Sequence, residues 1–212
     1  MSQQGTLQDE QGSGGLVRLS RGALLSRSLV VLGAIGGSAL GAADLAASSG
    51  SQSGSGPSPA RDQEILNLAL LMARLQAAFY ADALRAGRLT GESHQYADVV
   101  GKQEQAHVQY LAAALGPAAN QSPRFHFGDA TSDPTRFIAT AVSLETTSLE
   151  VYNGQAVNLT PTTLAAAARI VSVEARHAAW ARALAGQDPA PAAVDVPISV
   201  NQAKSVIAPF IG

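Results

Sequence analysis

Two four-residue segments, Glu104-Gln105-Ala106-His107 and Glu174-Ala175-Arg176-His177, carry most of the information about the fold of this chain. In each segment a carboxylate and an imidazole lie three residues apart, so on a helix they face the same side, one turn from each other. Apolar residues continue on that side at helical spacing, which indicates that it faces the core. A buried carboxylate without a partner is costly, and a metal ion is one partner that compensates it. The two segments therefore predict helices with inward-facing metal ligands.

Apolar residues recur with helical spacing in four stretches after residue 61. The second and fourth stretches contain the Glu-x-x-His segments. Short turns join the first stretch to the second and the third to the fourth, whereas a long connection (117–133) joins the two pairs. This spacing predicts an all-α fold, a four-helix bundle of two antiparallel hairpins with one long crossover. The expected helices end at or near Gly87, Gly116, Gly154 and Gly186.

The remaining two helices contribute one polar core residue each. Glu145 lies on the inward face of the third helix, and Gln76 lies at a similar depth in the first. Two Glu-x-x-His helices and two further carboxylates form the ligand set of di-iron and di-manganese bundles, but Gln76 offers only a neutral amide oxygen. The set holds one Fe or Mn ion, or two weakly; alternatively, it is a hydrogen-bonded network without metal. The candidate ligands are Gln76, Glu104, His107, Glu145, Glu174 and His177.

The chain before the bundle differs from it in composition. Residues 1–17 are predicted to be a disordered tail, and 46–61 a flexible linker rich in serine and glycine. Between them, 18–45 combines arginines with an uncharged apolar run, which is typical of an export signal or a membrane anchor. Either interpretation places the bundle (62–186), and a C-terminal tail (187–212) expected to wrap it, on the periplasmic side of the cytoplasmic membrane. Glycines four residues apart give the apolar run a smooth face: Gly33, Gly37 and Gly41.

The composition excludes several classes of function. The chain has 212 residues, of which 14% are charged and 46% hydrophobic, and its formal net charge is −2. This charge gives no reason to expect a nucleic-acid partner. The chain contains no cysteine. Disulfide frameworks, thiolate zinc sites, Fe–S clusters and cysteine nucleophiles are therefore excluded.

Residues 62–212 resemble the ferritin-like domain family, in particular its desiccation-related branch. The resemblance implies a ferritin-like four-helix bundle with a metal centre. It also implies glutamates on the first helix, where this sequence has Met72 and Gln76 instead. The matching segments are Leu75 to Tyr80, Glu104 to His107, Glu145 with Tyr152-Asn153-Gly154, Glu174 to His177, Val196-Pro197-Ile198 and Pro209-Phe210-Ile211.

Two functions follow from these observations. The missing first-helix carboxylate argues against catalysis and favours a structural or docking subunit of a membrane or cell-envelope complex. Its partner would bind through the glycine face of 18–45 and the surface of the bundle. The alternative, implied by the resemblance, is a metal-binding protein: an Fe or Mn oxidase, a peroxide-detoxifying protein, or a stress and desiccation protein.

Overall fold

The computed structural model describes residues 56–212. The predicted tail (1–17), the signal or anchor segment (18–45) with its glycine face, and most of the predicted linker (46–61) lie outside the described residues. Within 56–212, no helix is long and apolar enough to cross a membrane.

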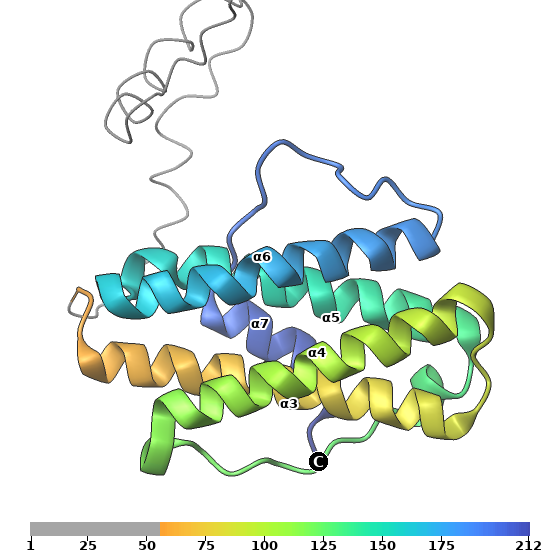
Figure 1. Ribbon diagram of the computed structural model, residues 1–212, viewed down its shortest axis with the longest axis horizontal. Coiled ribbons are helices and arrows are strands. Elements are labelled where there is room, and N and C mark those ends of the chain that lie inside the picture. The colour runs from red at the N-terminus through yellow and green to blue at the C-terminus, as the bar shows by residue number, and fades with distance from the viewer. Residues whose placement is uncertain (1–55) are drawn as a thin grey trace, which may run out of the picture. The chain divides into compact units, whose positions relative to one another are not determined.

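The described part of the chain is built of helices. Two long helices pack along each other as a first hairpin, two more form a second hairpin, and a short fifth helix packs on the first helix of the second pair (Figure 1). No strand forms within residues 56–212; one isolated bridge joins Phe125 to Ile211. The helices are α3 (Pro59–Ala86), α4 (Gly91–Leu115), α5 (Pro134–Gln155), α6 (Pro161–Leu184) and α7 (Val200–Ile207).

Local sequence signals set most helix ends. The Ser58 hydroxyl accepts a hydrogen bond from the Arg61 backbone N–H and so caps α3, which begins inside the predicted linker. Asp133 caps α5 in the same way, and a proline follows it at the first helical position. Gly87 ends α3 in the left-handed conformation, with φ 65°. The long crossover between α4 and α5 contains two single 3-10 turns, Gly116–Ala118 and Gly128–Thr131.

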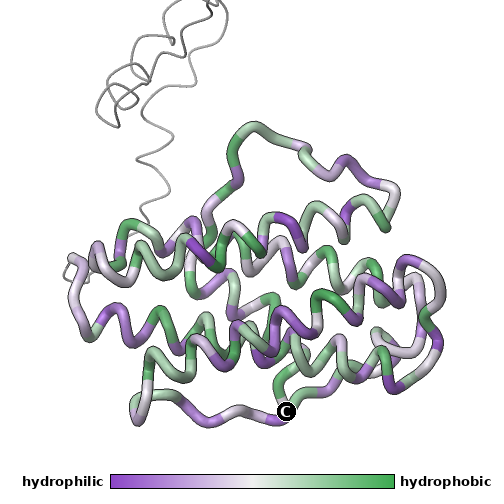
Figure 2. The backbone as a smooth tube through the Cα atoms, in the orientation of Figure 1, coloured by the Kyte–Doolittle hydropathy of each residue, from purple (hydrophilic) through white to green (hydrophobic). Residues whose placement is uncertain are grey.

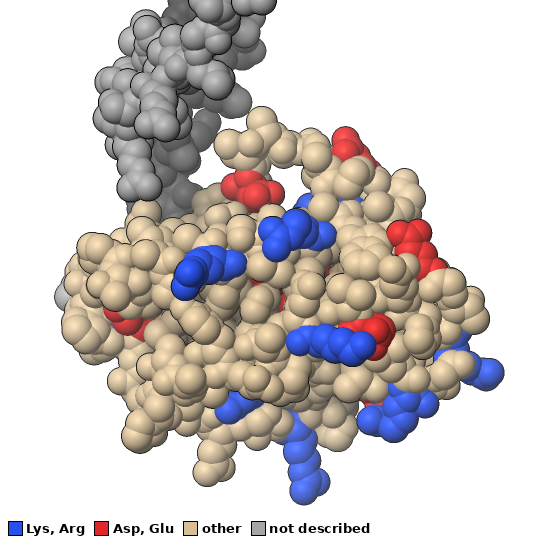
Figure 3. All heavy atoms as spheres, viewed as in Figure 1, with Lys and Arg blue, Asp and Glu red and all other residues tan. Residues whose placement is uncertain are grey.

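The core lies between the two hairpins. Hydrophobic and hydrophilic residues alternate along the helices, as expected where each helix buries one face (Figure 2). The largest buried side chains are aromatic and come from α3, α4 and α5, and their rings pack mostly edge to face. They are Phe79, Tyr80, Tyr96 and Phe137. On the face drawn in Figure 3, basic and acidic side chains are scattered over a largely uncharged surface.

Two glycines allow close contacts between elements. A Cβ at Gly101 of α4 would come within 2.9 Å of the Tyr80 Cβ, so glycine lets α4 approach α3 at that point. A Cβ at Gly154 would clash with the Ile198 carbonyl oxygen. We predicted Gly154 as a helix end; α5 continues one residue further, to Gln155, and Gly154 makes room for the C-terminal segment.

The C-terminal tail contains a helix that was not predicted from the sequence. Residues 187–197 are exposed, after which Ser199 and Gln202 form a capping box at the start of α7. α7 packs against α5 and buries Ala203 and Ile207 in the main core. The helix was missed because eight residues are too few to show a clear period among the surrounding prolines.

Asp62 links the first hairpin to the second. Its carboxylate accepts hydrogen bonds from the Thr160 backbone N–H at 2.9 Å and from the Thr160 and Thr163 hydroxyls at 2.5 Å each. Thr160 is the N-cap of α6 but its own side chain makes no capping bond, so Asp62 supplies the cap from another helix. A negative charge at this position also interacts favourably with the dipole of α6, whose N-terminal end is positive.

We expect Asp62→Asn to lower the free energy of unfolding by about 2 kcal/mol, because the amide nitrogen that replaces Oδ2 cannot accept the hydrogen bonds of the two threonine hydroxyls. The control is Glu64→Gln two residues away, where an exposed pair with Arg61 is worth about 0.5 kcal/mol. Burial raises the pKa of Asp62, but the threonine hydrogen bonds outweigh it and lower the pKa below 3.8. The stabilisation is therefore present at neutral pH and is lost as the pH falls through that lowered pKa. Urea denaturation at pH 7 and pH 3 measures the free energy of unfolding of both proteins. Equal values for Asp62→Asn and the unsubstituted protein at pH 7 would contradict this explanation.

Candidate metal centre

Five polar side chains from three helices meet inside the bundle. α4 contributes Glu104 and His107, α5 contributes Glu145, and α6 contributes Glu174 and His177. The three carboxylates and His177 are buried, and the His107 side chain is 12% exposed. One ligand atom from each of the four buried residues can be chosen so that all four atoms lie within 4.8 Å of one another.

The imidazoles lie between the carboxylates. His177 Nδ1 is 3.1 Å from Glu104 Oε1 and 3.3 Å from Glu145 Oε2. His107 Nδ1 is 3.4 Å from Glu104 Oε1 and 3.2 Å from Glu174 Oε1. Both histidines therefore lie next to the same oxygen of Glu104.

These atoms lie close together without forming well-aligned hydrogen bonds. Among the described residues, both Nδ1 atoms, both oxygens of Glu104 and one oxygen each of Glu145 and Glu174 have no hydrogen-bond partner. Buried polar groups are normally paired, and an unpaired one costs about 1–3 kcal/mol. A cation at the centre of the cluster would pair with several of these atoms at once.

Gln103 fixes the orientation of His177 from the surface side. The Gln103 Oε1 atom lies 2.6 Å from His177 Nε2 and can only accept a hydrogen bond, so Nε2 carries the proton. This leaves Nδ1, the nitrogen that faces Glu104 and Glu145, as the position that a proton or a metal occupies. Metal-binding histidines commonly make such a hydrogen bond with the ring nitrogen that does not face the metal, and the bond sets their tautomer.

The charges within the cluster are coupled. Burial would lower the pKa of both histidines, but the facing carboxylates outweigh it and raise the pKa of His107 to about 9 and of His177 to about 10. Burial and the charge of Glu104 raise the pKa of Glu174 to about 8. Without a metal, the two histidines are therefore protonated at pH 7 and their positive charges lie among the carboxylates.

Gln76 is buried in α3, and neither its Nε2 nor its Oε1 has a hydrogen-bond partner among the described residues. A buried amide without partners is costly. The unpaired amide oxygen is a neutral donor atom that could bind a cation. This agrees with the prediction of Gln76 as a metal ligand.

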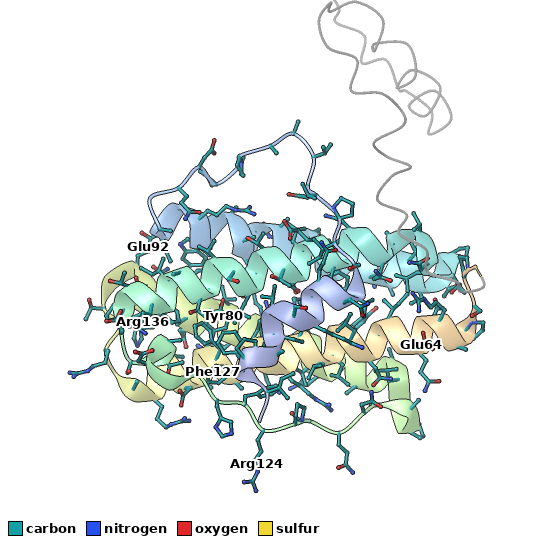
Figure 4. The ribbon with its side chains drawn as sticks, turned by 180° about the vertical axis from the view of Figure 1, so that it is seen from behind. Glu64, Tyr80, Glu92, Arg124, Phe127 and Arg136 are labelled. Atoms are coloured by element: carbon teal, nitrogen blue, oxygen red, sulfur yellow. The ribbon has the colours of Figure 1, made fainter. Side chains whose placement is uncertain are left out.

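Two buried tyrosines support the cluster from the side of α3 and α4. The Tyr80 hydroxyl donates to Glu145 Oε1 at 2.5 Å and lies 3.2 Å from the Tyr96 hydroxyl. Tyr96 in turn donates to the backbone oxygen of His177 at 3.4 Å. Figure 4 shows Tyr80 inside the bundle. Because Tyr80 pairs with Oε1 of Glu145, the other oxygen, Oε2, stays directed at His177.

We expect Gln103→Leu to weaken metal binding about 10- to 100-fold, because the His177 ring loses the bond that sets its tautomer. Gln105→Leu, on the same helix and also exposed, is the control and should bind metal normally. Isothermal titration with Mn²⁺ measures both. Equal affinities for the two variants would show that Gln103 does not orient the histidine.

Comparison with known proteins agrees with this geometry. The sequence model of the ferritin-like domain family matches residues 61–187, which span α3 to α6 except for the first two residues of α3. The chain belongs to the ferritin-like domain family. The predicted family is thereby confirmed, and the bundle of α3 to α6 is its ferritin-like domain. No curated protein matches the chain.

Five residues that were predicted as ligands from the sequence meet in this ferritin-like domain, and a sixth, Gln76, is buried in it. Gln103 was not predicted, since a surface glutamine beside a ligand has no sequence signature. The hydroxyl partners of Tyr80 and Tyr96 were not predicted either, because a tyrosine at a core position gives no sign of which polar group its hydroxyl meets. His94 and His126 are exposed and stand apart from the cluster.

Proposed function

We propose that this ferritin-like domain binds one redox-active first-row metal ion, Fe²⁺ or Mn²⁺, among Glu104, His107, Glu145, Glu174 and His177. The observation that supports the proposal most strongly is the set of six buried, unpaired nitrogen and oxygen atoms that converge there from three helices. Carboxylate and imidazole donors without thiolate suit Fe and Mn.

The spacing of the donor atoms suits a single ion. Donors held at about 2.1 Å from one ion lie about 3.0–4.2 Å from each other. The four N···O separations around His107 and His177 are 3.1–3.4 Å, within that range. These nitrogen and oxygen atoms can therefore bind the same ion without large changes in the His–Glu distances.

The charge of the site also favours one ion over two. Three ionised glutamates carry −3, so one divalent ion leaves −1 and one trivalent ion leaves none, whereas two divalent ions leave +1. A net positive charge in a buried site is unfavourable without a further carboxylate. Gln76 stands in the first helix, where the family supplies that carboxylate, and a glutamine adds no charge.

The protein's own residues control access to such an ion. An ion of this type supplies one-electron chemistry when bound. Glu104, Glu145 and His177 are almost fully buried and exclude water from one side, while the partly exposed His107 lies nearest to solvent. Tyr80 and Gln103 hold Glu145 and His177 in place. The export signal or anchor lies outside the described residues. The docking role, which also involves the surface of the bundle, stays a prediction.

Metal titration at several pH values tests the proposed function. Because His107 and His177 are protonated at pH 7 in the absence of metal, an ion bound by both histidines displaces two protons. Protons then compete with the metal, so the affinity for Mn²⁺ should rise about 100-fold from pH 6 to pH 7.

Isothermal titration in buffers of different ionisation enthalpy gives the stoichiometry and the number of protons released. The expected result is one ion per chain with proton release. Absence of saturable binding at pH 8, where the competition is weaker, would overturn the proposal.

A further inference from the structure

One end of the bundle is formed by two stretches of sequence that contain no charged residue. The first, 108–123, covers the last part of α4 and the start of the crossover, and the second, 151–168, covers the end of α5 and the start of α6. Both are tied to the first turns of α3: the Asn67 amide donates to the Ala118 backbone oxygen at 3.0 Å, and Asp62 caps α6. Figure 1 shows these helix ends together at one end of the bundle. We call the surface formed by 108–123 and 151–168 the neutral end.

The charges of the described residues are concentrated away from the neutral end. The first turns of α3, which adjoin it, contribute Asp62, which is buried, and Arg61 and Glu64, which pair at 2.9 Å. Figure 4 labels Glu64 toward this end and Glu92 and Arg136 at the opposite one. The opposite end carries many exposed charges from α3, α4, the crossover and α5, namely Arg85, Arg88, Glu92, Asp129, Asp133 and Arg136. The surface charge therefore differs strongly between the two ends of the bundle.

The neutral end also exposes large apolar side chains. Val157, in the turn between α5 and α6, is 79% exposed, Tyr110 is 42% exposed and Leu164 is 39% exposed. They are three of the six exposed large hydrophobic residues in the described part of the chain, and the other three lie in the C-terminal segment. One exposed valine is ordinary on a soluble protein. Exposed apolar side chains on a surface without charge indicate contact with a medium in which charge is costly.

The chain that precedes α3 joins the bundle at the neutral end. The sequence before α3 is the predicted linker (46–61), and before that lies the predicted signal or anchor (18–45). A serine- and glycine-rich linker of this length spans about 20 Å as a coil. α3 has 28 residues and is therefore about 42 Å long, so the charged end is farther away by that length. An anchor in a bilayer would thus hold the neutral end next to the lipid surface.

We propose that the neutral end rests on the surface of a lipid bilayer. Val157 and Leu164 insert between the lipid headgroups, and Tyr110 lies at the headgroup level, where tyrosine is commonly found. Because 108–123 and 151–168 contain no basic residue, the contact fits zwitterionic lipids and needs no anionic ones. The contact does not depend on the metal centre.

The strength of the contact depends on the connection to the N-terminal segment. Two partly inserted aliphatic side chains bind a bilayer weakly, because the apolar area that they bury is small. A short flexible connection raises the effective concentration of the nearby surface to about the millimolar range. A weak contact is then occupied most of the time, and the helix ends at the neutral end face lipid while the charged end faces water.

Spin labelling of the full chain tests the contact, and the absence of cysteine from the sequence makes single labels simple to place. Thr162→Cys places a nitroxide at the neutral end, and Ala86→Cys places one at the opposite end; both positions are exposed. Phosphatidylcholine vesicles should lower the collision rate of a water-soluble nickel chelate with the label at 162 about fivefold, and leave that at 86 unchanged. Electron paramagnetic resonance saturation measures both rates. Equal rates at 162 with and without vesicles would overturn the proposal, as would equal protection at 86.

Two valines with the same exposure provide matched variants. Val157 and Val194 are each 79% exposed, but Val194 lies in the C-terminal segment outside the neutral end. In the chain labelled at 162, Val157→Asp should restore the collision rate to its value without vesicles, because a carboxylate resists transfer into the headgroup region. Leu164→Asp should act in the same way, and Val194→Asp should change nothing. Circular dichroism verifies folding, and equal effects of Val157→Asp and Val194→Asp would contradict the lipid contact.

Two further measurements identify other occupants of the neutral end. Anionic phosphatidylglycerol added to the vesicles should leave the protection at 162 unchanged. Protection that appears only with this lipid and is lost in salt would assign binding to the exposed Arg169 and Arg176 of α6 and overturn the proposal. Double electron–electron resonance between labels on different chains should give no defined distance. A single narrow distance would show that a second copy of the chain covers the neutral end instead of lipid.

Discussion

His177→Ala is expected to lower the affinity for Mn²⁺ or Fe²⁺ about 100-fold or more, because it removes the donor nitrogen that lies between Glu104 and Glu145. The same substitution should destabilise the metal-free protein at pH 7 by about 3 kcal/mol. Without the imidazolium, two buried carboxylates face each other with no cation between them. One side chain therefore supports both metal binding and folding.

The pH dependence of the second effect has a definite sign. As the pH falls and Glu104 and Glu145 become protonated, their repulsion disappears, so the stability difference between His177→Ala and the unsubstituted protein should shrink. His94→Ala is the control, since His94 is exposed on the same protein and lies outside the cluster. Equal metal content in the two variants, measured by mass spectrometry of the bound metal, would contradict the assignment of His177.

Gln76→Glu is expected to raise the metal stoichiometry from one ion per chain toward two. The substitution keeps the shape of the side chain and brings the carboxylate charge from −3 to −4, which balances two divalent ions. In the metal-free protein the fourth buried carboxylate has no partner and should cost about 3 kcal/mol of stability. Metal should restore that loss, so the melting temperatures of the metal-free and metal-loaded forms should differ more than in the unsubstituted protein.

A second buried glutamine provides the control for Gln76→Glu. Gln155 is 2% exposed and lies at the end of α5, where its Oε1 accepts a hydrogen bond from Asn158. Gln155→Glu should also destabilise the protein, but without a change in stoichiometry and without rescue by metal. If both variants behaved alike in the titration, Gln76 would be a packing residue and not a vacant ligand position.

Much of the domain could be predicted from the sequence because its signals are local. Helical spacing and proline after Asp133 or Thr160 predict the helices, and the long connection predicts two hairpins. The Glu-x-x-His segments predict the centre because i, i+3 spacing on a core-facing side leaves only one direction for both side chains.

Other contacts had no local signal. Asp62 looks like an ordinary first-turn acid of α3, but it caps α6, which is 98 residues away along the chain. The partners of Tyr80 and Trp180 likewise depend on how separate helices meet. Contacts of this kind are set by packing between elements, and a single sequence does not record packing.

The most direct test of the metal centre is a crystal structure of the full chain grown with Mn²⁺ or Fe²⁺, with anomalous diffraction measured at the absorption edge of that metal. We expect one anomalous peak enclosed by Glu104, Glu145, Glu174 and His177, at about 2.0–2.3 Å from the donor atoms, with His107 beside it. We expect no second peak of equal height next to Gln76. A crystal in which exposed carboxylates bind the metal at full occupancy and the cluster binds none would contradict this assignment.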